Sequence, residues 1–306
     1  MTSGSPGSSV RSRFLRSLSA TKPVFQRLYE QFDRNTSVED PVNLVRRYDK
    51  AADREVAGFC AAALSFGRVR SVLTSIEALL AVMGSSPANF VSQFNPSRDG
   101  PTIQTLRHRW ISGADLVALI AIIQKMIMTE GSIEKFFLRG YRDDADDIGD
   151  ALDSFCVRAL AVSTGTDADG IGYFFPRPTK GSACKRLNLY LRWMVRRDHI
   201  DFGLWQRVSA TKLIVPLDTH VIRVSQCLRL TRYKSPGWAM AREITAALRQ
   251  IDAEDPVKYD FSLCHIGMQD ICGFNRPQLD TRCPLRGVCQ PGARRPRVSQ
   301  QPSFQR

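Results

Sequence analysis

Residues 215–224 read Val-Pro-Leu-Asp-Thr-His-Val-Ile-Arg-Val. Asp218 follows a proline and precedes apolar residues at helical spacing, so the pattern predicts a helix over 218–230 with Asp218 as its N-cap. N-capping alone explains an aspartate at this position. A chemical role for Asp218 therefore needs support from another part of the chain.

A second segment, residues 181–188, reads Gly-Ser-Ala-Cys-Lys-Arg-Leu-Asn. A glycine turn that opens a helix exposes unpaired backbone N–H groups at the positive helix end, which is a ready site for a phosphate. Lys185 falls in the first turn of the helix predicted over 185–197. A lysine there is a candidate nucleophile, although any single helical lysine is more commonly a solvated one.

Most of the chain has helical periodicity, and no segment alternates as a β-strand does. The pattern predicts an all-α fold with at least ten helices in two lobes, one lying mostly before about residue 165, with the N-terminal helix returning to the other. The helical domain is expected over 21–290, between disordered basic tails at 1–20 and 291–306. Besides the two helices above, helices are expected over 53–83 (with a break at Phe66-Gly67), 114–128, 150–162, 238–251 and from 255 to 268 or beyond.

The net charge of +13 lies mainly at the two ends of the chain. Residues 1–29 carry five basic and no acidic residues, and residues 281–306 carry six and none, which leaves +2 for the remainder. Basic arms suit a polyanion such as DNA, although solvated tails explain them equally well. A further basic cluster surrounds the candidate lysine: Lys180, Lys185, Arg186, Arg192, Arg196, Arg197, Arg207 and Lys212.

The chain has no apolar run long enough to span a bilayer and no secretory signal, so we expect a cytoplasmic protein with reduced cysteines. Four of its eight cysteines crowd the C-terminal part of the sequence, which favours a metal or cluster over disulfides. These are Cys264, Cys272, Cys283 and Cys289. The other four stand singly in apolar helical patterns and are typical of small buried side chains.

Together, residues 181–188 and 217–224 resemble motifs of the helix-hairpin-helix DNA glycosylases, the endonuclease III superfamily. Residues 64–68 are similar to the loop that inserts into the gap left by a flipped nucleotide in that superfamily. The resemblance covers about residues 50–290, and the chain as a whole more closely resembles a bacterial family of conserved hypothetical proteins. It implies that Lys185 attacks the sugar and Asp218 helps expel the base. The residues expected to contact DNA are Gly181, Ser182, Ala183, Arg186, Arg68, Arg192, Arg196 and Arg197.

Three features depart from the endonuclease III pattern. The second hairpin glycine is replaced by Ala183. Lys185 and Asp218 are 33 positions apart, a spacing closer to that of archaeal 8-oxoguanine glycosylases, and the insert over 196–216 contains Trp205, a candidate for base stacking or for packing. The endonuclease III pattern has four cysteines, and this chain has Asp280 in place of the second.

The cysteine set leaves the cofactor open. Cys272, Cys283 and Cys289 are three candidate ligands of a [4Fe–4S] cluster, with Cys264 or His265 as the fourth, and the alternative is no metal. His220 is expected to be a packed, hydrogen-bonded residue, as in the related signature, rather than a general base.

The sequence therefore favours a DNA-binding base-excision glycosylase, with a possible AP-lyase activity, that acts as a monomer. The alternative is a non-catalytic DNA- or RNA-binding protein that keeps the helix-hairpin-helix scaffold.

Overall fold

A computed structural model describes residues 18–32, 40–163, 170–269 and 283–289. These residues form thirteen α-helices and three short 3₁₀ turns, and the only β pairing among them is two isolated bridges, His108–Ile111 and Arg197–Phe202. The predictions of an all-α fold and of at least ten helices are confirmed. Within the described ranges, no helix combines the length and the apolar character that crossing a membrane requires.

The helices follow one another along the chain with short connections. Several predicted boundaries are confirmed within two or three residues, including the break between α4 and α5. The elements are α2 (Lys22–Glu30), α3 (Val42–Arg46), α4 (Ala51–Leu64), α5 (Val69–Met83), α6 (Pro87–Ser92), α7 (Pro96–Gln104), α8 (Gly113–Glu130), α9 (Ile133–Leu138), α10 (Gly149–Val162), η1 (Ile171–Tyr173), η2 (Pro178–Lys180), α11 (Lys185–Val195), η3 (Ala210–Lys212), α12 (Thr219–Cys227), α13 (Trp238–Arg249) and α14 (Asp260–Met268).

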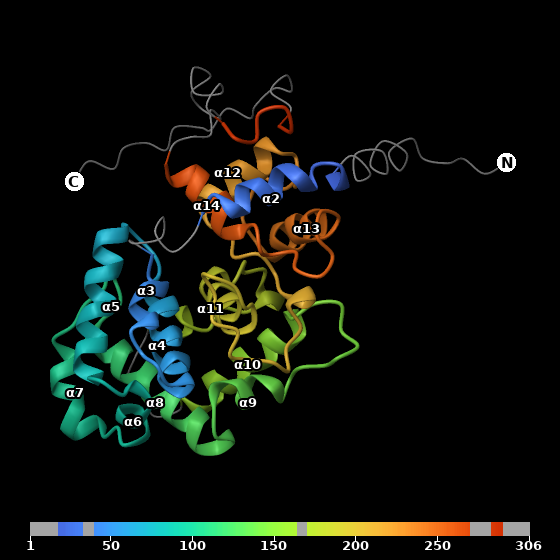
Figure 1. Ribbon diagram of the computed structural model, residues 1–306. Helices are drawn as coiled ribbons and strands as arrows, with labels where there is room; N and C mark the ends of the chain where they lie inside the picture. Colours follow the sequence, from blue (N-terminus) through green and yellow to red (C-terminus); the bar gives the residue numbers. More distant parts are fainter. Residues whose placement is uncertain (1–17, 33–39, 164–169, 270–282, 290–306) are drawn as a thin grey trace.

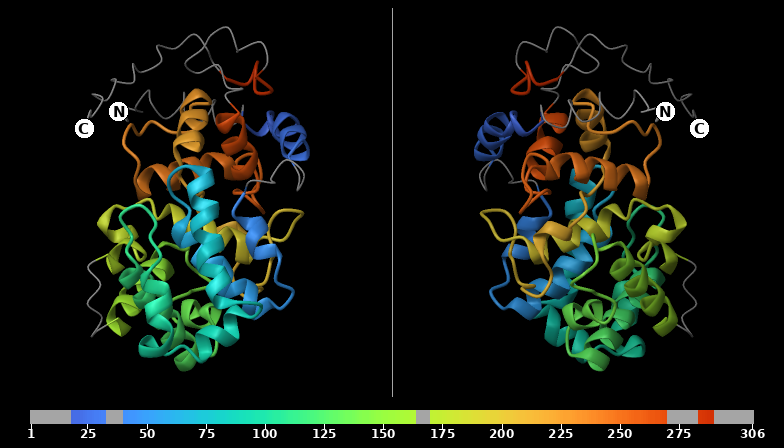
Figure 2. Two further views of the ribbon diagram at one scale, coloured as in Figure 1. Left: turned by 90° about the vertical axis from the view of Figure 1, so that its left-hand side faces the viewer. Right: turned by 90° about the vertical axis from the view of Figure 1, so that its right-hand side faces the viewer.

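The N-terminal helix α2 lies with the last helices of the chain rather than with its sequence neighbours. Figures 1 and 2 show α2 beside α12, α13 and α14 at one end of the molecule, and α2 contacts α14 directly. Helices α3 to α9 occupy the other end, and α11 lies between the two groups, against α4.

Two glycines allow the helices that border the candidate site to approach closely. A Cβ at Gly58 of α4 would lie 2.9 Å from Met194 Cε of α11. A Cβ at Gly267 of α14 would lie 2.6 Å from His220 Cβ of α12. At Gly267 the neighbouring atoms are the Cβ and Cα of His220, so a side chain there would push α14 away from α12, whereas at Gly58 the nearest atom is the flexible end of Met194.

A buried carboxylate joins three separate segments. Glu55 of α4 accepts hydrogen bonds from the backbone N–H groups of Ile133 (3.2 Å) and Glu134 (2.8 Å) at the start of α9, and from Trp205 Nε1 (2.9 Å). It thereby satisfies orphan donors of α9 and fixes the insert that follows α11. Of the two roles predicted for Trp205, the structure shows packing, because this side chain is only 2% exposed.

One predicted helix begins later than expected. Residues 256–259 form turns, and α14 starts at Asp260. The Asp255 carboxylate is bound by Arg196 Nε at 2.8 Å, and Asp252 accepts both the Asp255 N–H at 3.2 Å and Lys258 Nζ at 2.9 Å. These tertiary contacts stabilise a turn before Asp260, where the sequence had predicted helical hydrogen bonds. The short helices α3, α6, α7 and α9 were not assigned from the sequence, and α6 and α7 both begin with a proline at the first position.

We expect Glu55→Ala to lower the free energy of unfolding by at least about 2 kcal/mol, because it leaves three donors, two of them in buried hydrogen bonds, without an acceptor. Glu77→Ala is the control: its carboxylate is half exposed and pairs with Arg47 at the surface, so the loss should stay below about 1 kcal/mol. Urea unfolding followed by circular dichroism measures both. Equal losses in the two variants would contradict a joining role for Glu55.

Candidate functional site

A cavity of about 470 Å³ lies where the α4–α5 loop, the starts of α11 and α12, and helix α14 meet. Both Lys185 and Asp218 line it, although they are 33 positions apart in the sequence. The α4–α5 loop contributes Ser65, Phe66 and Gly67. The cavity therefore gathers the two candidate catalytic residues and part of the segment that resembles an inserting loop.

Lys185 is the first residue of α11, and its half-buried side chain reaches toward the α4–α5 loop. Its Nζ is 3.5 Å from the Ser65 carbonyl, which is a weak contact. The turn before it takes the left-handed conformation at Gly181 (φ 81°) and Cys184 (φ 48°), not at Ala183. Replacement of the second hairpin glycine by Ala183 therefore causes no strain of this kind.

Two backbone N–H groups of this turn, which were candidates for binding a phosphate, are already hydrogen-bonded within the protein. The Gly181 N–H donates to the Pro178 carbonyl at 2.9 Å, and the Ser182 N–H donates to the Arg177 carbonyl at 3.3 Å. A phosphate at this turn would therefore meet N–H groups at the start of α11 rather than those of Gly181 and Ser182. The segment immediately before the turn is the 3₁₀ turn η2, not an α-helix.

Asp218 is the N-cap of α12, as predicted. Its Oδ1 accepts the backbone N–H of Val221 at 2.7 Å, and its Oδ2 accepts the thiol of Cys264 at 3.0 Å. One donor on each oxygen fixes the orientation of the carboxylate at the cavity wall. Cys264 thus acts as a hydrogen-bond donor to the candidate catalytic acid, a role that the sequence did not suggest.

The electrostatic surroundings keep Cys264 in its thiol form. Burial raises the pKa of Cys264 well above its ordinary value, and the neighbouring carboxylates Asp218 and Asp260 raise it further, with Lys185 opposing them. A thiol donates to Asp218, whereas a thiolate would repel it. The thiol form of Cys264 can therefore hold the Asp218 carboxylate in place.

The predicted cluster ligands are described only in part. Cys283 is buried and Cys289 is half-buried, while Cys272 lies outside the described residues. Among the residues that the structure describes, no three His, Cys, Asp or Glu side chains come together in a way that could hold a metal ion. The [4Fe–4S] cluster stays a prediction.

A second carboxylate, Asp260, borders the cavity and was missed by the sequence analysis. Its Oδ2 accepts Arg192 Nη1 at 2.5 Å, and its Oδ1 is buried without a hydrogen-bond partner among the described residues. Burial raises the pKa of Asp260 to about 7, with Asp218 adding to this effect and Arg192 opposing it. Asp260 can therefore hold or release a proton near neutral pH.

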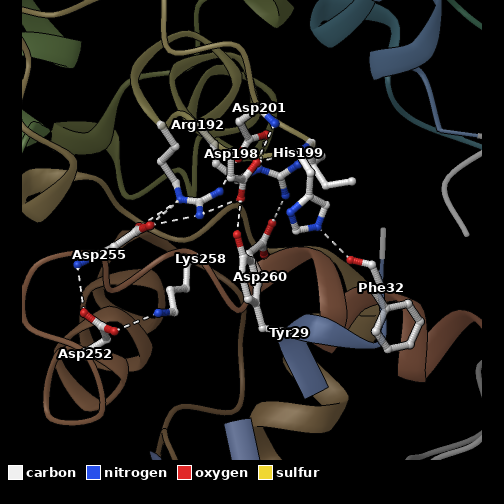
Figure 3. Close-up of polar contacts among 12 residues, drawn as sticks. Tyr29, Phe32, Arg192, Asp198, His199, Asp201, Asp252, Asp255, Lys258 and Asp260 are labelled. Carbon is white, nitrogen blue, oxygen red and sulfur yellow. Dashed lines mark hydrogen bonds and ion pairs between the residues drawn. The ribbon is translucent and has the colours of Figure 1, made fainter. Parts of the chain in front are cut away.

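Two of the predicted DNA-contacting arginines are bound inside the protein instead. The side chains of Arg192 and Arg196 are each 4% exposed. Arg192 pairs with Asp201 and Asp260, as Figure 3 shows, and Arg196 pairs with Asp198, Asp201 and Asp255. The prediction of phosphate contacts is wrong for both, because carboxylates already satisfy their guanidinium groups.

Arg186, the third arginine of this kind, was also expected to contact DNA and is bound inside the protein. It is 8% exposed, donates to the carbonyls of Ala63 (2.9 Å) and Tyr173, and lies 3.7 Å over the Tyr173 ring. These contacts leave the guanidinium group unavailable to DNA. The other predicted contacts remain open, since Arg68, Arg197 and Gly181 are exposed and Ser182 and Ala183 are half-buried.

His220 lines the cavity as well. It packs against Gly267, in agreement with a structural role. Its Nδ1, however, is buried without a hydrogen-bond partner among the described residues. The expectation of a packed side chain is met, whereas a hydrogen bond at Nδ1 is not formed.

Comparison with known proteins places the chain in a family. The profile of the family described as "Protein of unknown function (DUF2400)" matches residues 40–269, so the chain belongs to that family. No curated protein and no solved structure matches it. The matched range contains every residue that lines the cavity.

The proton on Asp260 should appear in the pH dependence of stability. An unfolded aspartate has a pKa of about 3.9, whereas Asp260 in the folded protein has a pKa of about 7. Because the folded-state pKa is raised, the associated stability is fully present below about pH 4 and is lost as the pH rises to about 7. We expect the free energy of unfolding of the wild type, relative to that of Asp260→Asn, to fall over this interval and then stay constant. Urea titrations across the pH range measure the difference, and parallel curves would show that Asp260 is ionised throughout.

Proposed function

We propose that this member of the DUF2400 family binds DNA and removes a damaged base, with Lys185 as the nucleophile and Asp218 as the carboxylate that supports it. One observation carries the proposal: the two residues line the same cavity although a long insert separates them in sequence. A third polar group, Asp260, borders the same space. The resemblance to helix-hairpin-helix glycosylases rests on these same positions.

The cavity suits a flipped nucleotide in size and lining. Its volume of about 470 Å³ falls in the usual range of small-molecule sites. Phe66, Leu189 and Phe261 give it apolar walls, alongside polar and charged residues that include Lys185 and Asp218. Extruding a base into such a space costs a few kcal/mol and favours bases whose pairing is already weakened.

The proposed reaction is a nucleophilic displacement at the sugar. The unprotonated Lys185 amine attacks C1′ while the bond from C1′ to the base nitrogen breaks, and the base leaves with the bonding electron pair and takes up a proton. Asp218 stabilises the positive charge that develops on the sugar. Opening of the sugar ring then converts the C1′ amine into a Schiff base, from which elimination of the 3′ phosphate would cleave the strand.

The carboxylates of the site have distinct roles in this scheme. Asp218 is held by Val221 and Cys264, one donor on each oxygen, so it keeps its orientation as the sugar changes charge. Asp260, with a pKa of about 7, is suited to supply the proton that the leaving base takes up. Both residues line the cavity.

Borohydride trapping on a panel of lesion-containing duplexes tests the proposal, because reduction of the Schiff base leaves a stable covalent adduct. Lys185→Gln should abolish the adduct and leave lesion binding nearly unchanged. Lys180→Gln is the matched control, since this exposed lysine lies five positions earlier beside the same turn, and its adduct should match that of the wild type.

Asp218→Asn keeps a capping side chain, so its stability should hardly change while turnover falls by orders of magnitude. An adduct that persists in Lys185→Gln would assign the nucleophile elsewhere. DNA binding without an adduct on any lesion would favour the non-catalytic DNA- or RNA-binding protein.

A further inference from the structure

Trp110 is an exposed aromatic side chain close to the cavity. It is 53% exposed, whereas Trp193 and Trp205 are buried and Trp238 is half-buried. It lies in residues 107–111, between α7 and α8, which we call the Trp110 turn.

The Trp110 turn is held rigidly. An isolated bridge pairs His108 with Ile111, and Arg109 takes a left-handed conformation (φ 55°) between them. His108 is hydrogen-bonded through Nδ1 to Ser75 Oγ and through Nε2 to the Phe66 carbonyl, both at 2.9 Å. The position of Trp110 is therefore set by the α4–α5 loop that also lines the cavity.

Aromatic and cationic groups in mutual contact connect Trp110 to the cavity, with the rings tilted or edge-on to one another. The Phe66 ring is 4.9 Å from the Trp110 ring and 5.0 Å from the Tyr173 ring. The Arg109 guanidinium lies 4.8 Å from the centre of the Trp110 ring. Since Phe66 is itself a cavity wall, the exposed ring and the cavity belong to one surface.

The two loops next to Trp110 carry charge of one sign. Residues 66–70 and 105–111 carry Arg68, Arg70, Arg107 and Arg109, all exposed, and contain no acidic residue. The two loops touch, since a Cβ at Gly67 would lie 3.1 Å from the Arg109 side chain. An exposed aromatic ring between two basic loops has the chemistry that binds a single nucleic-acid strand, whose phosphates meet the arginines while a base stacks on the ring.

We propose that the Trp110 turn binds an unpaired nucleobase of a DNA strand, stacked on the Trp110 ring beside the mouth of the cavity. The surface would serve either a catalytic or a non-catalytic protein, because it requires no chemistry at Lys185. An intact duplex offers the ring no unpaired base. The turn therefore discriminates between stacked and unstacked DNA.

Affinity for a short oligothymidylate and for an intact duplex of equal length tests the proposal. Trp110→Ala should lose roughly tenfold in affinity for the oligothymidylate and keep its affinity for the duplex. Met128→Ala, which removes another large exposed apolar side chain (73% exposed), is the control and should change neither. Arg109→Gly, which suits the left-handed conformation, should weaken binding of both DNAs by removing one cation.

Fluorescence gives a second readout. Binding of the oligothymidylate should quench the tryptophan emission, and Trp110→Phe should keep most of the affinity but lose the quenching. The same series in a Lys185→Gln background separates this proposal from the glycosylase proposal, since stacking on Trp110 should be unchanged there. Unaltered oligothymidylate affinity in Trp110→Ala, or equal losses for both DNAs, would overturn the stacking assignment.

Discussion

The arrangement of this protein depends on a buried ion cluster formed by two arginines and four aspartates. Figure 3 shows Arg192 among these carboxylates, with Asp201 and Asp260 as its partners. Arg196 pairs with Asp198, Asp201 and Asp255. Charges this deeply buried are costly to leave unpaired, so removal of any one partner leaves an uncompensated ion. The cluster therefore specifies how α11, the insert and the residues before α14 are joined.

The cluster also connects the candidate site to distant parts of the chain. Tyr29 of α2 donates to Asp198 at 2.8 Å, which attaches the N-terminal helix to the insert. At the other end, Asp260 belongs to both the cluster and the cavity wall, and it begins α14, the helix that carries Cys264 and packs against α12. The ion pairs that fix α11 against α14 thus set the separation between Lys185 and Asp218. Within the insert, Asp201 pairs with both arginines, and Trp205 is bound to Glu55 of α4.

Sequence alone predicted the parts of this structure that depend on local pattern. The break at Phe66-Gly67 and the cap at Asp218 follow from residues a few positions apart, and both lie where expected. The roles of Arg192 and Arg196 were misjudged because a basic run shows the sign of its charge but not its partners, and Asp260 is 68 positions from Arg192. Trp110 was missed for the same reason, since its exposure is set by contacts between two loops that are distant in sequence.

Lys185 differs from the three buried arginines near it, because their guanidinium groups are bound by protein oxygens. Arg186, Arg192 and Arg196 are each bound by protein oxygens. Within the described residues, by contrast, no carboxylate lies within ion-pair distance of Lys185, and its Nζ makes only the 3.5 Å contact to the Ser65 carbonyl. This lysine is instead half-buried at the cavity wall, without a carboxylate partner among the described residues. Such a position leaves the amine available to a ligand, which is the condition that a nucleophile must meet.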